Sequence, residues 1–171
     1  YVADTNNDRI VKLGPDGGIL FRLGRRNGSG NFIPGKDPGE FNKPFGVALS
    51  ALGQIHVADS ENRRVQVFSS SGVFVRQFAL PPSLDGKTTG EDALGKPAGV
   101  AVDALGRIYV TDSQKGRLIT FAGDGTVLTQ FPIPGALMGS PAGEAPESVT
   151  APFGGAVTAS RAGGSPMADP P

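Results

Sequence analysis

The sequence predicts an all-β protein, a partial and open β-propeller of about three four-stranded antiparallel blades. The first observation is a ten-residue motif at residues 1–10, 56–65 and 109–118, with starts 55 and 53 residues apart. The second is a glycine sixteen residues after each start. The third is a Pro-x-Gly pattern that also occurs three times, with its prolines 53 and 55 residues apart. Self-similarity at this period, without helical periodicity, is typical of propellers and other repeat architectures.

Each complete repeat contains four short runs rich in β-branched and aromatic residues. The runs of the second copy are 46–49, 55–58, 64–68 and 73–78, and those of the third are 99–102, 108–111, 117–121 and 126–131. Turns rich in Gly, Ser and Asp separate these runs, so we expect antiparallel meanders. Every other residue of the first run is small, as Gly46 and Ala48 show, which suits the crowding of innermost strands around a propeller axis.

The repeat boundaries divide the chain into blades and connecting loops. We expect a partial blade at 1–24 and complete blades at 43–80 and 96–131, joined by long inter-blade loops at 25–42 and 81–95. Together they make one propeller region over residues 1–131. Three blades are too few to close a ring, so the chain needs missing blades or self-association to do so.

The composition changes after residue 131. Residues 132–171 are rich in Pro, Gly and Ala, and a fourth repeat that starts at 151–158 does not reach its second strand. Such a composition favours a disordered tail. A decayed blade, a truncated sequence and a shifted reading frame are all compatible with this segment.

Composition limits the classes of partner and chemistry. With 16 basic and 16 acidic side chains the net charge is zero, which argues against a protein that coats nucleic acid or an anionic membrane. The chain has no cysteine, so disulfides and thiol chemistry are excluded. No apolar run approaches the roughly 20 residues of a membrane span. Localisation is left open, and a secreted or periplasmic protein is compatible if a leader precedes Tyr1.

The order of these motifs resembles the NHL repeat. The second copy is the cleanest, with Pro44 and Gly46 in the first strand and Asp59, Asn62 and Arg64 at the later turn. The resemblance covers about residues 1–131 and the repeat start at 151–158. It implies blades of a six-bladed ring, and across the family it implies protein, peptide, carbohydrate or RNA ligands. The chain departs from the family in its small number of blades and its two long inter-blade loops.

One acidic and one basic residue recur in every copy, five positions apart. We interpret these pairs as structural staples, because an Asp after a strand accepts backbone N–H groups and an Arg across the turn can pair with it. A catalytic site needs one constellation rather than three copies. The staple residues are Asp4, Arg9, Asp59, Arg64, Asp112 and Arg117.

Patterns that would indicate an enzyme fail on inspection. The run Asp4-x-Asn6-x-Asp8 begins like a calcium loop, but Arg9 replaces the required Gly. Residues 30–36 and 90–96 begin like phosphate-binding loops, yet neither is followed by Ser or Thr. His56 is the only histidine, and it occupies a strand position that is tyrosine in the other copies. We therefore predict no catalytic, cofactor-binding or metal-binding residues and no cofactor.

The turns between second and third strands and the inter-blade loops are expected at one end of the propeller. Loops on a rigid scaffold are where binding residues concentrate. The basic residues of this candidate binding face are Arg25, Arg26, Lys36, Arg63, Lys87 and Lys115. Acidic residues are interspersed among them, which suits a protein or peptide better than a phosphate backbone. Ordinary solvated loops are the alternative interpretation.

We interpret the chain as a non-enzymatic binding scaffold that presents its loops to a protein, peptide or carbohydrate partner. One alternative is a fragment of a propeller enzyme, of the metal-dependent lyase or hydrolase type, with its catalytic residues on missing blades. A second alternative is an RNA-binding propeller, which would need a basic face that the interspersed acids here largely cancel.

Overall fold

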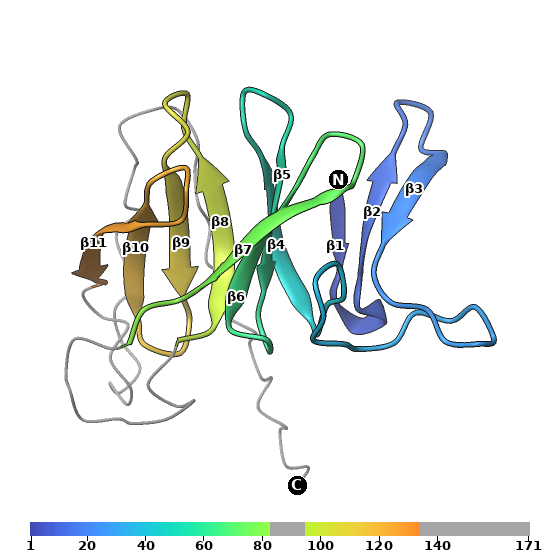
Figure 1. The fold of residues 1–171 in the computed structure, drawn as a ribbon, viewed down its shortest axis with the longest axis horizontal. Helices are drawn as coiled ribbons and strands as arrows, with labels where there is room; N and C mark the ends of the chain where they lie inside the picture. The colour runs from blue at the N-terminus through green and yellow to red at the C-terminus, as the bar shows by residue number, and fades with distance from the viewer. Residues whose placement is uncertain (83–94, 134–171) are drawn as a thin grey trace, which may run out of the picture. The chain divides into compact units, whose positions relative to one another are not determined.

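The computed structural model describes residues 1–82 and 95–133, all of which belong to one compact unit. These residues form three separate antiparallel sheets in chain order (Figure 1). The fold is all-β and the sheets do not close into a ring, so the predicted partial and open β-propeller is confirmed. The predicted tail, apart from residues 132 and 133, lies outside the described residues, and so does most of the second inter-blade loop.

Every strand pairs with its neighbour in sequence. Blade 1 has three strands, β1 (Val2–Asp4), β2 (Arg9–Leu13) and β3 (Ile19–Leu23), with a 3-10 turn at Thr5–Asn7. Blade 2 contains β4 (Pro44–Leu49), β5 (Ile55–Asp59), β6 (Arg64–Phe68) and β7 (Phe74–Ala79). Blade 3 contains β8 (Pro97–Val102), β9 (Ile108–Asp112), β10 (Arg117–Phe121) and β11 (Val127–Pro132).

The first strands of blades 2 and 3 start earlier than the sequence pattern indicates. Pro44 pairs with Asp59, and Pro97 pairs with Asp112, before an irregularity shifts the register. Proline lacks the N–H of a ladder hydrogen bond and is tolerated at the first residue of a strand. The small-residue pattern therefore finds the regular part of the strand and misses its beginning.

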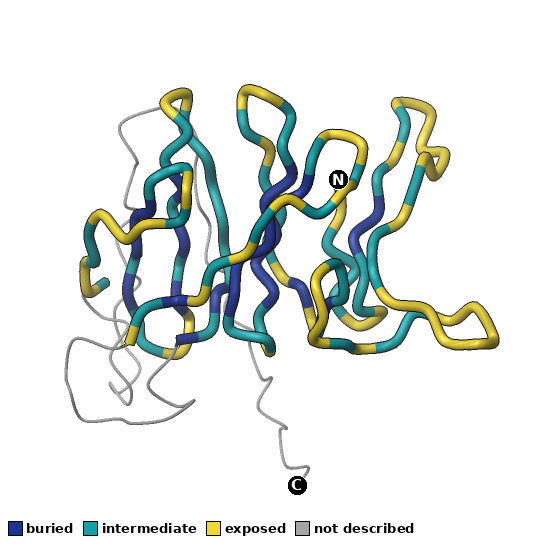
Figure 2. The backbone as a smooth tube through the Cα atoms, in the orientation of Figure 1, coloured by how far each residue is buried: buried dark blue, intermediate teal, exposed yellow. Residues whose placement is uncertain are grey.

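Blade 2 is buried on both faces because it lies between two core clusters. All residues of β5 and β6 are buried (Figure 2). Toward blade 1, Ile55, Val57 and Phe68 pack with Ile10 and Phe41. Toward blade 3, the buried residues of the second cluster are Val65, Leu80, Ile108, Val110, Ile119 and Phe121. Alternation along each strand thus sends successive side chains to different blade interfaces.

The first strands approach each other closely, as their small residues predict. A Cβ atom at Gly46 would clash with the carbonyl oxygen of Ala98 in β8. Only glycine fits this contact without moving the backbone of one strand.

The turns between second and third strands share one end of the blades with the inter-blade connections. The backbone N–H of Glu61 donates to the carbonyl of Asn42 at 3.1 Å, and that of Leu80 donates to Arg63 at 3.2 Å. We call this the connector end, which is the lower end in Figure 1. The opposite Gly-turn end carries the turns at 50–53, 69–72, 103–106 and 122–125. No helix in the described part of the chain is long and apolar enough to cross a membrane.

Candidate functional site

The Asp59 carboxylate lies at the centre of the connector end of blade 2. It is fully buried and accepts hydrogen bonds from Nε of Arg64 at 2.8 Å, Nδ2 of Asn62 at 2.9 Å and Nε2 of Gln66 at 3.0 Å. The backbone N–H of Asn42 donates to its other oxygen at 2.8 Å. A buried carboxylate is tolerated when donors of this kind surround it.

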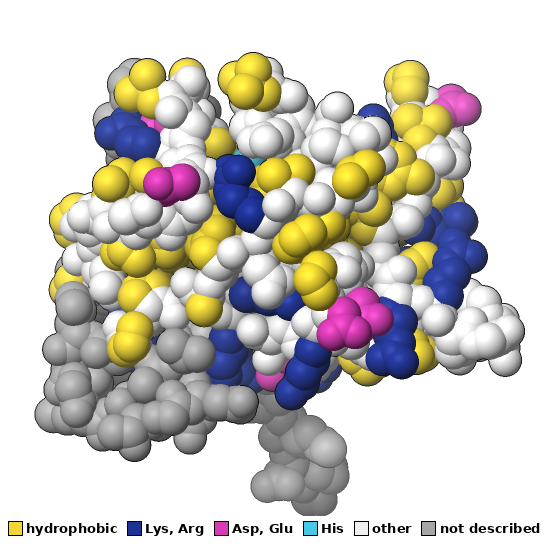
Figure 3. Space-filling view, viewed as in Figure 1, with side chains coloured by type: hydrophobic (Ala, Val, Ile, Leu, Met, Phe, Trp, Pro, Cys, Tyr) yellow, Lys and Arg dark blue, Asp and Glu magenta, His cyan; other side chains and the backbone are white. Residues whose placement is uncertain are grey.

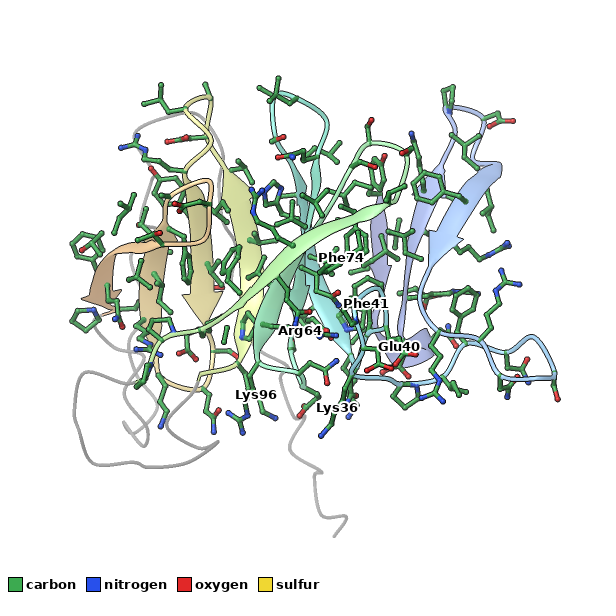
Figure 4. The ribbon with its side chains drawn as sticks, in the orientation of Figure 1. Lys36, Glu40, Phe41, Arg64, Phe74 and Lys96 are labelled. Atoms are coloured by element: carbon green, nitrogen blue, oxygen red, sulfur yellow. The ribbon has the colours of Figure 1, made fainter. Side chains whose placement is uncertain are left out.

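The Arg64 guanidinium joins blade 2 to the inter-blade segment 25–42, which we call the first connector. Its Nη1 donates to the carbonyl of Lys36 at 2.6 Å and to Oε1 of Gln77 at 2.7 Å. Its Nη2 donates to the carbonyls of Asp37 at 3.1 Å and Glu40 at 2.9 Å. Figure 4 shows Arg64 lying between β6 and the connector residues. Arg64 therefore fixes the connector on the sheet.

Two amide side chains add to this attachment. Nε2 of Gln66 donates to the carbonyl of Glu40 at 2.7 Å, while its Oε1 accepts the N–H of Gly39 at 2.9 Å. Nδ2 of Asn62 donates to the carbonyl of Gly35 at 2.8 Å. Residues 35–40 are thus bonded to blade 2 along their whole length, and their backbone polar groups are not left for water alone.

Blade 3 repeats the arrangement with a different connecting segment. Nε of Arg117 donates to the buried Asp112 at 2.8 Å, and its Nη1 donates to Gln130 at 2.5 Å. Its remaining N–H groups donate to the carbonyls of Pro81 at 2.6 Å and Pro82 at 2.8 Å. A second carbonyl-bound arginine shows that the repeat uses this residue to hold the segment that enters the blade.

Blade 1 has the same pair in a more exposed setting. Nε of Arg9 lies 2.7 Å from Asp4, and both side chains are about a quarter exposed, at 27% and 26%. The Arg64 and Asp59 side chains of blade 2 are only 9% and 0% exposed. Arg22 occupies the β3 position that corresponds to Gln77 and Gln130. That the three pairs act as structural staples stays a prediction, with these contacts as its support.

Burial and hydrogen bonding shift the pKa values of Asp59 and Asp4 in opposite directions. Burial raises the pKa of Asp59 above its ordinary value, although donors from Asn42, Asn62 and Arg64 favour the charged form. Burial also acts to raise the pKa of Asp4, but the hydrogen bonds from Asn7 and Arg9 outweigh it and leave the value lowered.

The basic residues of the predicted binding face separate into three places. Arg25 and Lys36 line a hollow of about 370 Å³ with Asp37, Glu40 and Asn42. In this hollow Nε of Arg25 lies 3.6 Å from Oε1 of Glu40. The Lys36 side chain lies at the lower end of the molecule in Figure 4, as does that of Lys96.

The second place is the pair of turns in blades 2 and 3, where Nη1 of Arg63 donates to Oε1 of Gln114 at 2.7 Å. Lys115 follows Gln114 in the same turn, and Lys96 pairs with Glu61 nearby at 2.7 Å. Arg26 is in the third place, over the ring of Phe32, with its guanidinium carbon 4.6 Å from the ring centroid. Lys87 lies outside the described residues. The role of this face in binding stays a prediction.

His56 is buried in β5 at 2% exposure, and its Nδ1 has no hydrogen-bond partner within the described ranges. Burial lowers its pKa, and the positive charge of Arg76 contributes to the shift. In blade 3 the equivalent Tyr109 donates its hydroxyl to Asp103 at 3.2 Å. Among the residues that the structure describes, no three His, Cys, Asp or Glu side chains lie close enough together to hold a metal ion.

Sequence reasoning missed the glutamines that complete the Arg clusters. Gln77 and Gln130 lie 53 residues apart, the same spacing as Arg64 and Arg117, so the repeat alignment contained this signal. Gln66 has no such signal, because its counterparts are Val11 and Ile119. The carbonyl acceptors of the connectors carry no side-chain signature at all.

Comparison with known proteins supports the repeat assignment. The family model for the NHL repeat matches residues 41–68 and 94–121. The chain is 33% identical to Protein brain tumor of Drosophila melanogaster over 132 residues, which are 76% of this chain and 11% of that protein. It is 42% identical to NHL repeat-containing protein 3 of Mus musculus over 71 residues, 40% of this chain and 18% of that protein. E3 ubiquitin-protein ligase TRIM32 of Homo sapiens is 35% identical over 96 residues, 53% of this chain and 14% of the relative.

Solved structures share the fold at low sequence identity. Virginiamycin B lyase from Staphylococcus aureus has a TM-score of 0.53 at 17% identity, over 77% of this chain and 36% of the lyase. The WD40 repeats of RRP9 give a TM-score of 0.52 at 12% identity, over 74% of this chain and 33% of that chain. At these identities the likeness shows the fold alone, and the chain spans only 11–18% of the three sequence relatives named above. The repeated motifs, the blade geometry and the matching relatives show that this chain belongs to the NHL-repeat family.

Proposed function

We propose that this chain is a non-enzymatic binding scaffold that presents the loops of its connector end to a protein or peptide partner. The observation that carries the proposal is the attachment of the first connector to blade 2. Arg64 alone donates to three backbone carbonyls of the connector, those of Lys36, Asp37 and Glu40. A loop fixed in this way presents its side chains in one arrangement, which is what a recognition surface on a rigid scaffold requires.

The charge pattern of the face indicates the class of partner. Basic and acidic side chains alternate around the hollow formed by Arg25, Lys36, Asp37 and Glu40. Figure 3 shows basic and acidic side chains side by side near this lower end of the molecule. A surface of mixed sign complements a folded protein or a peptide of mixed charge, whereas a nucleic-acid backbone requires a continuous basic track.

The relatives agree with a role in protein recognition, since one of them is named as an E3 ubiquitin-protein ligase. The alternative, a fragment of a propeller enzyme, places catalytic groups on blades outside this chain. Its support is the likeness to a lyase, and that likeness is one of fold.

A peptide-display selection tests the proposal with the chain as it stands. Random peptides displayed on phage are selected on the immobilised chain, and the affinity of an enriched peptide is measured for variants of the connector end. Arg25→Glu and Lys36→Glu reverse the charge of exposed side chains that line the hollow. The matched controls, Ala51→Glu and Ser70→Glu, place the same charge on exposed residues of the Gly-turn end.

We expect the connector-end variants to weaken the peptide by about tenfold or more, and the controls by less than about twofold. All four variants should keep the melting temperature of the original chain, because their side chains are exposed. Peptides that are lost with the Gly-turn controls and retained by Arg25→Glu and Lys36→Glu would place recognition at the opposite end and contradict the proposal.

A further inference from the structure

We propose that Arg9, Arg22 and Arg26 form a binding site for a phosphate monoester carried on a phosphorylated side chain of the partner. The kind of partner rests on the proposed function above. The site itself is a separate feature, on blade 1 and the beginning of the first connector.

The first step is a comparison of three equivalent arginines. In blades 2 and 3, Arg64 and Arg117 donate their Nη groups to a strand glutamine and to connector carbonyls. In blade 1, the Arg9 side chain donates Nε to Asp4 at 2.7 Å and makes no other hydrogen bond with the described residues. The repeat therefore aims the Nη groups of this arginine at oxygen acceptors, and in blade 1 the acceptor positions are open.

The second step concerns the residue beside Arg9. Arg22 stands where blades 2 and 3 have Gln77 and Gln130, so a cation replaces the side chain that accepts from the staple arginine. The backbone of Arg22 pairs with β2, but its side chain makes no hydrogen bond or ion pair within the described part of the chain. Two guanidinium groups without an intervening acceptor repel each other, and an oxyanion between them would remove that repulsion.

The third step is the geometry of the hollow. Arg9, Arg22 and Arg26 line a cavity of about 340 Å³ together with Asn7, Asn31 and Phe32. The Phe32 ring holds two of the arginines, with its centroid 5.2 Å from the guanidinium carbon of Arg9 and 4.6 Å from that of Arg26. An isolated backbone bridge between Arg26 and Phe32 closes the loop that carries this ring.

No acidic residue lines this cavity. The Asp4 carboxylate, which lies next to Arg9, is paired with that arginine. The remaining two arginines match the charge of a phosphate monoester, which carries about −1.5 to −2 at neutral pH. Guanidinium groups bind phosphate through paired N–H donors, and Asn31 in the lining offers a further amide group, whereas the Asn7 amide already donates to Asp4 at 2.8 Å.

A phosphorylated side chain fits the cavity better than a nucleic acid does. The three arginines form one isolated cluster on a chain of zero net charge, whereas a strand of RNA needs basic groups spaced along its backbone. The aromatic ring in the cavity is stacked by Arg9 and Arg26, which leaves less of its surface for a base.

Fluorescence anisotropy with three labelled probes and one unlabelled competitor tests the site. The probes are a short neutral peptide with one phosphoserine, the same peptide without phosphate and a single-stranded RNA of similar length, and the competitor is inorganic phosphate. The principal variant is Arg22→Gln, which restores the residue of the sister blades and gives Arg9 an acceptor. Arg26→Gln removes an exposed arginine as a second variant, and Lys43→Gln, at an exposed lysine that lines neither hollow, is the matched control.

We expect the phosphopeptide to bind, to be displaced by inorganic phosphate, and to bind at least about tenfold more tightly than the unphosphorylated peptide. Arg22→Gln and Arg26→Gln should each weaken it by about tenfold, and Lys43→Gln by less than about twofold. Equal affinity for the two peptides, or for the original chain and Arg22→Gln, would overturn the proposal. RNA that binds more tightly than the phosphopeptide and is lost with Arg22→Gln would assign the site to nucleic acid instead.

The outcome is separable from that of the peptide-display experiment. Charge reversal at Lys36 tests the connector end and leaves the arginine cavity intact. Arg22→Gln tests the arginine cavity and leaves the connector end intact. Loss of phosphopeptide binding in Arg22→Gln with unchanged display peptides would support the cavity as an independent site.

Discussion

Blades 1 and 2 carry the same Asp–Arg pair, yet the two pairs differ in everything that surrounds them. In blade 2 the pair is sealed beneath the first connector, and Asp59 and Arg64 exhaust their hydrogen-bonding capacity on strand and loop partners. In blade 1 the pair of Asp4 and Arg9 is about a quarter exposed and bonded mainly to itself. The comparison teaches that a repeated motif fixes a local contact, whereas the segment that covers it decides how much the contact contributes to stability.

The largest expected effect comes from breaking the two pairs in turn. Asp59→Ala leaves the buried Arg64 charge and several donors without their acceptor, and should lower the free energy of unfolding by about 3 kcal/mol. Asp4→Ala removes a partly exposed pair and should cost less than about 1 kcal/mol. Urea titration followed by circular dichroism measures both. Equal losses of unfolding free energy would show that the first connector does not change how much an Asp–Arg pair contributes to stability.

A second experiment concerns the pH dependence of stability and compares His56 of blade 2 with the equivalent Tyr109 of blade 3. Burial, with a contribution from Arg76, depresses the pKa of His56, so the folded protein resists its protonation. A depressed value means that stability is full above the unfolded pKa of about 6.5 and falls as the pH drops through the folded pKa. The loss approaches about 1.4 kcal/mol per pH unit in that window.

Replacing His56 with its blade 3 counterpart should flatten this dependence. The double variant His56→Tyr with Ser50→Asp transplants the Tyr109–Asp103 contact into blade 2. Urea midpoints between pH 5 and 8 measure the effect. A double variant with the slope of the original chain would show that His56 does not cause the pH dependence.

The smallest expected effect concerns Asp4, the carboxyl of the partly exposed pair in blade 1. Hydrogen bonds from Asn7 and Arg9 outweigh burial and depress the pKa of Asp4, so its contribution is present above about pH 4 and is lost as the pH falls through the folded value. Asp4→Asn should therefore reduce the acid sensitivity of unfolding, by less than about 1 kcal/mol because the pair is partly solvated. Thermal melts at pH 2.5 and pH 6 measure the difference, and an undiminished acid effect would assign it to other carboxyls.

The blades could be predicted because the same pattern of residues recurs in each copy of the repeat. Gly46 and Ala48 indicated the crowded inner strand, and the Asp and Arg at constant spacing indicated the paired turn. The burial and the hydrogen-bond partners of these pairs could not be predicted, because the backbone carbonyls of residues 36–40 that accept from Arg64 have no signature in side-chain patterns. Arg22 illustrates the same limit, since a single substitution within a repeat acquires meaning only once the strand register places it beside Arg9.

Arg26 shows where loop reasoning goes astray. Its place in an inter-blade loop predicts that it shares a surface with Arg25. The structure instead bridges it to Phe32, and Arg26 and Arg25 line different cavities. Adjacent residues of an irregular segment can face different surfaces, and no periodicity in the sequence reports which one each side chain takes.

The carbonyl-bound arginine of blade 2 also bears on how selectively the proposed partner would associate. Ordering a flexible loop costs about 1–2 kcal/mol of backbone entropy per residue, and here that cost is met when the chain folds rather than when it binds. Residues 35–40 are held by Arg64, Gln66 and Asn62 before any partner arrives. Under the proposed function, recognition at this end is a docking of preformed surfaces, in which mismatched partners are rejected because the loop does not adapt to them.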